Sequence, residues 1–154
     1  MLKIVSNNHA QTMKLGEILA TYLTSEDVVI LSGELGAGKT VLVRGIVKGY
    51  SGDEDLVRSP SYIYINTYKN GKTVHHIDFY LLNNYEQALD TGFEDLLNED
   101  LCLIEWGEKF EQLNDNSFWK VIIKYDGVNK RQIELIAPES RKETLEEIES
   151  KWPF

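Results

Sequence analysis

An eight-residue segment in the first third of the chain constrains the fold most strongly. Residues 33–40 read GELGAGKT and fit the pattern G-x-x-x-x-G-K-[ST]. The four apolar residues 28–31 precede it, as in a strand buried on both faces of a sheet, and apolar residues at helical spacing follow it at 41, 42, 46 and 47. A buried strand, a glycine-rich loop and a helix in this order predict a phosphate-binding P-loop.

The residue types in this loop suit a nucleoside triphosphate and Mg²⁺. Gly36 and Gly38 can take backbone angles closed to other residues, so that successive N–H groups surround a phosphate. The helix that begins near Lys39 adds its free N–H groups and the positive end of its dipole. Lys39 supplies a charge for the β- and γ-phosphates, and Thr40 offers a hydroxyl to Mg²⁺. The predicted ATP-binding residues of the loop are Gly36, Ala37, Gly38, Lys39, Thr40 and Val41.

Two acidic residues stand at the ends of further predicted strands. The apolar residues 101–104 end in Glu105, and the alternating segment 74–80 places Asp78 just before Phe79. A P-loop needs carboxylates on its metal side, normally at the end of a neighbouring strand. We therefore predict that Lys39, Asp78 and Glu105 are catalytic. The sequence leaves open which acid holds the metal and which orients the attacking water, and the alternative for each is a surface or capping carboxylate.

Composition narrows the class of protein. The length of 154 residues is that of one ordinary domain, so we expect a single domain spanning 1–154. The formal net charge of −9 repels phosphate backbones, which argues against unaided binding of RNA or DNA.

No apolar run approaches the roughly 20 residues of a membrane span, and the N-terminus lacks the features of a signal peptide. We expect a cytoplasmic protein without membrane contact, with the single Cys102 in its core.

The rest of the chain predicts a mixed sheet. Strand-like segments 62–68 and 73–80 flank Asn70-Gly71, a strong hairpin signal, and segments 118–125 and 132–137 form a second hairpin. Helices are expected at 10–23, after the P-loop, and at 141–150. The adjacent His75 and His76 face opposite sides of their strand and cannot bind one ion together. The predicted fold class is α/β: a three-layer P-loop NTPase-like fold with a mixed sheet that includes antiparallel hairpins.

Several blocks in the right order support a family resemblance. Besides the P-loop they are Arg44-Gly45, Ser59-Pro60-Ser61-Tyr62, His76-Ile77-Asp78-Phe79-Tyr80 and Ile104-Glu105-Trp106-Gly107-Glu108. The chain resembles the TsaE (YjeE) family, the ATPase component of the bacterial machinery that makes threonylcarbamoyladenosine next to the tRNA anticodon. It departs from the family pattern at three positions: Ser61, where Thr is common; Leu81, where Arg is common; and Gly107, near which Pro or Ser is common.

The resemblance implies roles for individual residues. Thr40 and Glu105 match the magnesium-side positions, Asp78 matches an acid near the γ-phosphate, and residues 59–61 match a switch-like loop. Thr12 and either Lys130 or Arg131 match the adenine side by position. The implied partners are TsaB-like and TsaD-like proteins, with tRNA met only indirectly through that complex.

Two alternatives from other classes remain. A small-molecule P-loop kinase would need an arginine-rich lid, whereas the chain has four arginines, Arg44, Arg58, Arg131 and Arg141. A nucleotide-dependent interaction module without useful hydrolysis would be expected to lack catalytic acids, but Asp78 and Glu105 are both present. The sequence alone does not decide between ATP and GTP.

Overall fold

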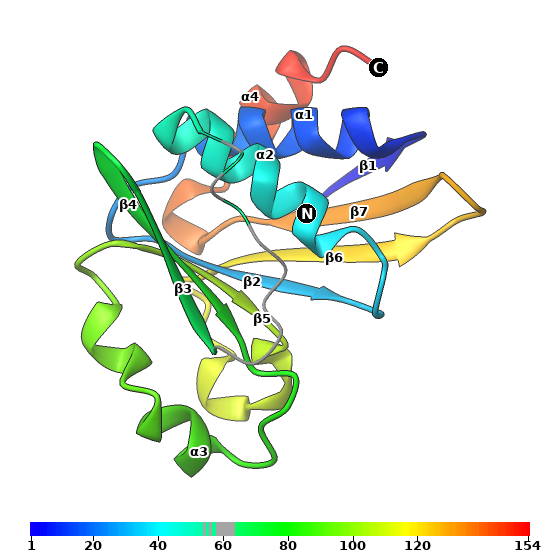
Figure 1. Cartoon of the computed structure of the whole chain (residues 1–154). Helices are drawn as coiled ribbons and strands as arrows, with labels where there is room; N and C mark the ends of the chain where they lie inside the picture. The colour runs from blue at the N-terminus through cyan, green and yellow to red at the C-terminus, as the bar shows by residue number, and fades with distance from the viewer. Residues whose placement is uncertain (54, 56, 58–63) are drawn as a thin grey trace.

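The computed structural model describes residues 1–53, 55, 57 and 64–154. Within these residues, seven strands form one sheet in the order β1-β7-β6-β2-β5-β4-β3 (Figure 1). The strands are β1 Leu2–Ser6, β2 Val28–Gly33, β3 Ile65–Asn70, β4 Lys72–Asp78, β5 Leu101–Glu105, β6 Trp119–Tyr125 and β7 Arg131–Ile136. The α-helices are α1 His9–Ala20, α2 Lys39–Ser51, α3 Tyr85–Asp90 and α4 Thr144–Lys151. The 3₁₀ turns are η2 Phe93–Leu96, η3 Gly107–Lys109, η4 Glu111–Leu113 and η5 Glu139–Arg141.

The centre of the sheet is parallel and its margins are antiparallel. Strands β4, β5, β2 and β6 run parallel to one another, whereas the β3–β4 and β6–β7 hairpins and the β1–β7 pair are antiparallel. This arrangement confirms the predicted mixed sheet. Because the carboxyl ends of parallel strands meet at one edge, the ends of β2, β4 and β5 lie side by side, as such folds require for a ligand site.

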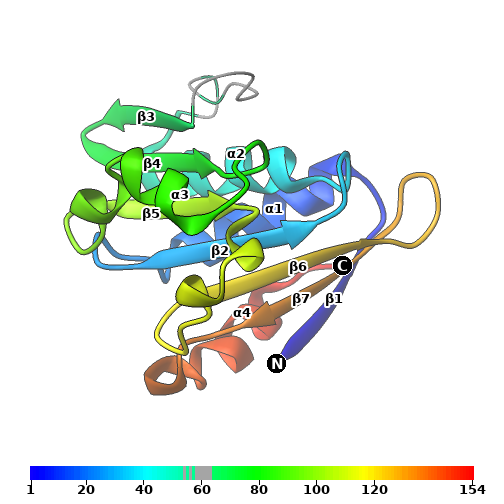
Figure 2. The same cartoon turned by 90° about the horizontal axis from the view of Figure 1, so that it is seen from below.

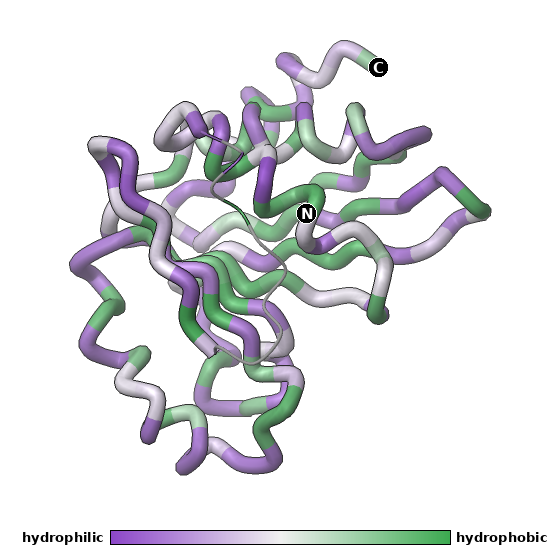
Figure 3. The backbone as a smooth tube through the Cα atoms, in the orientation of Figure 1, coloured by the Kyte–Doolittle hydropathy of each residue, from purple (hydrophilic) through white to green (hydrophobic). Residues whose placement is uncertain are grey.

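Elements cover both faces of the sheet and make three layers (Figure 2). On one face, α1, α2 and α4 pack over an apolar cluster that includes Leu101 and Leu103 of β5. On the other, α3 and the turns η2 to η4 cover a second cluster with Cys102 and Ile104. Alternate residues of one strand thus enter opposite cores, and the central strands are the most continuously apolar part of the chain (Figure 3). Burial raises the pKa of the Cys102 thiol to about 12, which agrees with a core residue rather than a nucleophile.

Glycines let α1 approach α2 closely and so fix the helix that follows the P-loop. A Cβ atom on Gly45 would lie 2.1 Å from the carbonyl oxygen of Met13, and one on Gly16 would lie 2.5 Å from that of Leu42. Side chains at either position would force the helices apart. The two glycines therefore set the depth at which α2 sits on the sheet.

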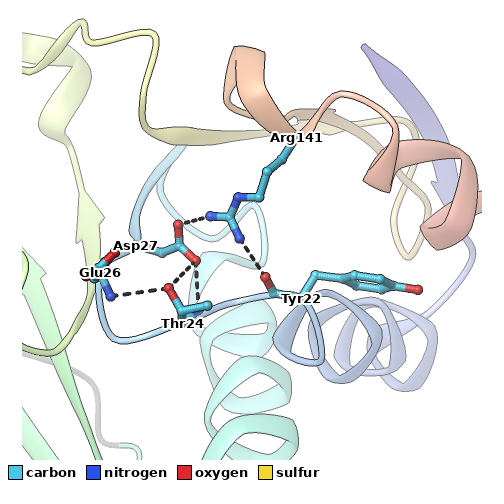
Figure 4. Close-up of polar contacts among 5 residues, drawn as sticks. All are labelled: Tyr22, Thr24, Glu26, Asp27 and Arg141. Carbon is cyan, nitrogen blue, oxygen red and sulfur yellow. Dashed lines mark hydrogen bonds and ion pairs between the residues drawn. The ribbon is translucent and has the colours of Figure 1, made fainter.

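At the other end of β2, an ion pair joins the α1–β2 turn to η5 (Figure 4). The guanidinium of Arg141 donates to the Asp27 carboxylate and to the Tyr22 carbonyl, the latter at 2.9 Å. The second carboxylate oxygen of Asp27 accepts from the Thr24 backbone N–H at 2.7 Å. Asp27 is buried, so this network compensates its charge at the sheet edge opposite to the P-loop.

The structure differs from the sequence prediction mainly in the helices. The first helix ends at Ala20 instead of residue 23, and the last begins at Thr144, after the turn η5, instead of residue 141. Helix α3 and the turns η2 to η4 were not predicted, because segments of three to six residues are too short to show a helical period. No helix in the described part of the chain is long and apolar enough to cross a membrane.

Candidate functional site

The predicted P-loop connects the end of β2 to the start of α2 (Figure 1). Gly36 has a φ of 77° and Gly38 a φ of 113°, both in the left-handed region that favours glycine. A Cβ atom on Gly38 would meet nothing within 4 Å, so open space adjoins the loop there. Gly38 is also the N-cap of α2 and makes no side-chain cap bond. The first N–H groups of α2 are therefore available to an anion.

A pocket of about 300 Å³ lies over this loop. It is lined by His9, Leu35, Gly36, Gly38, Lys39, Thr40, Val41, Asp78, Glu105 and Trp106. The structure thus brings most of the predicted loop residues together with both predicted acids. The sequence did not predict His9 or Trp106 at the site. For Trp106 a signal was available, because this residue directly follows Glu105.

The two acids are neighbours across strands. Asp78 and Glu105 are register partners at the ends of β4 and β5, and Glu105 pairs on its other side with Leu31 of β2. Burial raises the pKa of Asp78 and the charge of Glu105 adds to this effect, against the backbone N–H of Tyr80, which donates to Asp78 at 2.9 Å. A carboxylate with a raised pKa is a better proton acceptor than a solvated one.

The Lys39 side chain is enclosed by the same groups. The residue is 5% exposed, and its Nζ donates to the Gly33 carbonyl at 2.5 Å. The ammonium lies 3.9 Å from the centre of the Trp106 ring. Burial lowers the pKa of Lys39, while the charges of Glu105, Glu108 and Asp78 oppose that effect. Among the described residues, the pocket lining therefore sets the Lys39 cation beside two carboxylates, those of Asp78 and Glu105.

The donor set suits Mg²⁺ bound together with a phosphate. No cluster of three or more His, Cys, Asp or Glu side chains suitable for a metal occurs among the described residues. The pocket instead presents the Thr40 hydroxyl and the carboxylates of Asp78 and Glu105. Mg²⁺ is commonly held by one or two carboxylates and completes its shell with phosphate oxygens and water, so these residues fit it.

Two side chains of the β6–β7 hairpin form hydrogen bonds with the backbone of the P-loop. The Tyr125 hydroxyl donates to the Leu35 carbonyl at 2.9 Å, and Nε of Arg131 donates to the Ala37 carbonyl at 2.8 Å. The Arg131 guanidinium lies 4.4 Å from the centre of the Tyr125 ring. These bonds engage carbonyl groups on both sides of Gly36, which fixes the loop before any ligand binds.

Comparison with known proteins gives the family. A family model described as "Threonylcarbamoyl adenosine biosynthesis protein TsaE" matches residues 6–133. The chain belongs to the TsaE family. This confirms the resemblance inferred from the sequence blocks.

Relatives named "tRNA threonylcarbamoyladenosine biosynthesis protein TsaE" match over most of their length. The protein from Rickettsia felis is 35% identical over 144 residues, which cover 93% of this chain and 84% of the relative. The Haemophilus influenzae protein is 39% identical over 127 residues, which cover 80% and 79%. The crystal structure of YdiB from Bacillus subtilis has a TM-score of 0.75 at 26% identity and covers 97% of this chain and 94% of that one. The fold is therefore that of a P-loop NTPase of the TsaE type.

The structure does not bring the adenine-side residues implied by the TsaE resemblance to the pocket wall. The Thr12 hydroxyl is buried 2.7 Å from that of Ser6. Lys130 is exposed and pairs with Asp126, and the Arg131 guanidinium is engaged by backbone carbonyls. A role of these residues at the adenine stays a prediction. The switch-like loop expected at residues 59–61 lies outside the described residues.

Proposed function

We propose that this chain is the ATP-binding and ATP-hydrolysing component of the complex that forms threonylcarbamoyladenosine in tRNA next to the anticodon. In this role it acts as a nucleotide-dependent switch on TsaB-like and TsaD-like partners. The observation that carries the proposal is the pairing of Asp78 with Glu105 beside the P-loop lysine, in a chain whose relatives are named for this tRNA modification.

Each group of the pocket has a part in this proposal. The N–H groups of residues 36–41 bind the ATP phosphates, and Lys39 exchanges its bond to the Gly33 carbonyl for the β- and γ-phosphates. Thr40 and Glu105 hold Mg²⁺, which when bound neutralises charge on the phosphate oxygens. Asp78, with its raised pKa, accepts a hydrogen bond from the attacking water.

Slow hydrolysis by the isolated chain is part of the proposal. An arginine that stabilises the transition state contributes roughly 10³ to 10⁵ in rate. Among the described residues no arginine lines the pocket, and Arg58 lies outside them. We infer turnover below about one per second without partners, and stimulation when a partner supplies the missing charge.

We propose that the partner proteins, and not this chain, contact the tRNA. A net charge of −9 disfavours binding of tRNA by the lone chain, so a basic partner surface is needed. We further propose that residues 1–154 form a single ATPase domain, since the pocket lining comes from α1, the P-loop, α2 and the ends of β4 and β5, which all adjoin one sheet. The cytoplasm, where tRNA is modified, is the proposed location.

Two measurements test this function. Steady-state ATP hydrolysis is followed for the chain alone and after addition of TsaB-like and TsaD-like proteins from the same host, with bovine albumin as the protein control. A titration at physiological salt measures tRNA binding by the chain alone and in the complex. We expect slow basal hydrolysis, stimulation only by the partners, and tRNA binding only by the complex. Rapid partner-independent hydrolysis, or tight tRNA binding by the lone chain, contradicts the proposal.

A further inference from the structure

A chain of buried polar side chains crosses three strands and ends at Glu105. The Tyr68 hydroxyl of β3 lies 3.1 Å from Nδ1 of His76 on β4. Nε2 of the same ring lies 2.5 Å from Oε2 of Glu105 on β5. His76 is fully buried, and Tyr68 and Glu105 are 5% and 4% exposed. A polar chain at this depth is costly to bury unless each member is hydrogen-bonded, as these are.

The hydrogen-bonding capacity of each group fixes the direction of the bonds. An ionised carboxylate only accepts, so Nε2 of His76 carries the hydrogen that Glu105 receives. The other nitrogen of a neutral imidazole is then an acceptor, and the Tyr68 hydroxyl donates to it. Tyr68 thus selects the tautomer of His76 that donates to Glu105.

This bond occupies one of the two oxygens of Glu105. In the part of the chain that the structure describes, Oε2 is engaged by His76 and no bond is found to Oε1. His76 lies on the same face of β4 as Asp78, because the two are separated by one residue. The bond therefore acts on the pocket side of the sheet.

We propose that His76, backed by Tyr68, is a positioning residue that holds Glu105 with one oxygen free for the metal bound with the nucleotide. The inference rests on the proposed function, in which Glu105 is a metal-side carboxylate. Hydrogen bonds from the surrounding shell to metal ligands commonly contribute 10- to 100-fold in metal affinity.

The neighbouring histidine offers a matched control. His75 is 5% exposed, and its Nε2 lies 2.9 Å from Asp100 while Nδ1 lies 2.9 Å from the Thr67 hydroxyl. It therefore forms the same hydroxyl–imidazole–carboxylate arrangement in the same strand. However, adjacent strand residues face opposite sides, so this second arrangement does not reach the pocket.

The test uses paired substitutions. Tyr68→Phe and Thr67→Val each remove one hydroxyl, and His76→Leu and His75→Leu each remove one imidazole. His76→Gln keeps an N–H donor within reach of Glu105. Calorimetry measures the dissociation constant of a non-hydrolysable ATP analogue with EDTA and with Mg²⁺, and their ratio gives the gain in affinity due to the metal.

We expect every variant to bind the analogue in EDTA within about twofold of the wild type. The gain due to Mg²⁺ should fall about 10-fold or more in His76→Leu and by a smaller factor in Tyr68→Phe, and His76→Gln should restore part of it. His75→Leu and Thr67→Val should keep the wild-type gain. If His76→Leu does not fold, Tyr68→Phe compared with Thr67→Val decides the result.

Two results overturn the inference and leave the proposed function standing. An unchanged metal gain in Tyr68→Phe and in folded His76→Leu shows that the chain does not position Glu105. Equal losses in the His75 and His76 pairs show a general effect of damage to β4. A wild-type chain that gains no affinity from Mg²⁺ contradicts the proposed function itself, and the inference then fails as well. A normal gain in the wild type, with the same gain in the His76 and Tyr68 variants, overturns the inference alone.

Discussion

The Lys39 ammonium lies over the Trp106 ring, 3.9 Å from its centre, while it donates to the Gly33 carbonyl. The lysine is thus held against the base of its own loop by an aromatic face and a backbone oxygen, interactions of moderate strength. Phosphates bound to the loop offer it stronger, charge-assisted bonds. The indole of Trp106 is therefore placed to report the movement of this cation.

The first prediction concerns the fluorescence of that indole. Addition of ATP and Mg²⁺ should change the emission of the wild type, because the ammonium leaves the ring. The change should be absent in Trp106→Phe, in which Trp119 and Trp152 still emit. Titration of both proteins by tryptophan fluorescence checks this. An equal change in Trp106→Phe would show that the signal arises elsewhere.

The second prediction concerns the acids. Glu105→Gln and Asp78→Asn should still bind ATP but hydrolyse it at least about 10-fold more slowly, because each loses the charge that serves the metal or the attacking water. The magnesium concentration for half-maximal rate should rise for Glu105→Gln, since we assign that residue to the metal side. Hydrolysis rates measured over a range of Mg²⁺ check both statements. Full activity in both variants would mean that these carboxylates only cap their strands.

The third prediction is a pH dependence of stability. Burial raises the pKa of Asp78 above its ordinary value of 3.8, so ionisation of this group disfavours the folded state. The stability that Asp78 contributes to the folded state is fully present below pH 3.8, the ordinary pKa, and is lost as the pH rises through the raised pKa of the folded state. Asp78→Asn should therefore gain stability relative to the wild type as the pH rises above about 4. Urea unfolding across this range measures the difference. The exposed control Asp90→Asn should show no such trend, and a flat difference for Asp78→Asn would contradict the assignment.

The fourth prediction separates stability from function. Arg141→Met leaves the buried Asp27 without its cation and should lower the free energy of unfolding by about 1 to 3 kcal/mol, less than for a fully buried pair because Arg141 is partly exposed. Nucleotide affinity should stay unchanged, since Asp27 of this network (Figure 4) immediately precedes β2, whereas the P-loop follows the other end of that strand. Urea unfolding and calorimetry check the two halves. Weakened nucleotide binding in the folded variant would contradict this separation.

The features predicted from sequence were those with a local signal. The run at 28–31, the loop at 33–40 and the turn at Asn70-Gly71 each carry their pattern within a few residues, and the structure confirms the strand, the loop and the hairpin. The sequence predicted Asp78 and Glu105 at strand ends near the P-loop, and the structure shows that their strands are parallel neighbours. The sequence blocks shared with the TsaE family occur in the same order along this chain, and this order supported the family resemblance.

The contacts that the sequence did not predict join residues far apart in the chain. The bond from Arg131 to Ala37 spans 94 positions, and that from His76 to Glu105 spans 29. Both depend on which strands become neighbours and in what register, which no local pattern encodes. For this reason the bonds of the Arg131 guanidinium to the loop backbone were not predicted, and His76 was only excluded from a shared metal site. The placement of Lys130 or Arg131 at the adenine side, made by position, stays a prediction.

Binding and hydrolysis of ATP by Lys39→Ala test the central claim most directly. The substitution removes the charge that faces the β- and γ-phosphates, and Lys142→Ala, which changes an exposed lysine outside the pocket lining, is the control. We expect Lys39→Ala to bind MgATP more weakly and to lose at least about a hundredfold in hydrolysis rate, or roughly 2.7 kcal/mol, while Lys142→Ala matches the wild type. Near-normal affinity and turnover in Lys39→Ala would contradict the assignment of this loop as the ATP site.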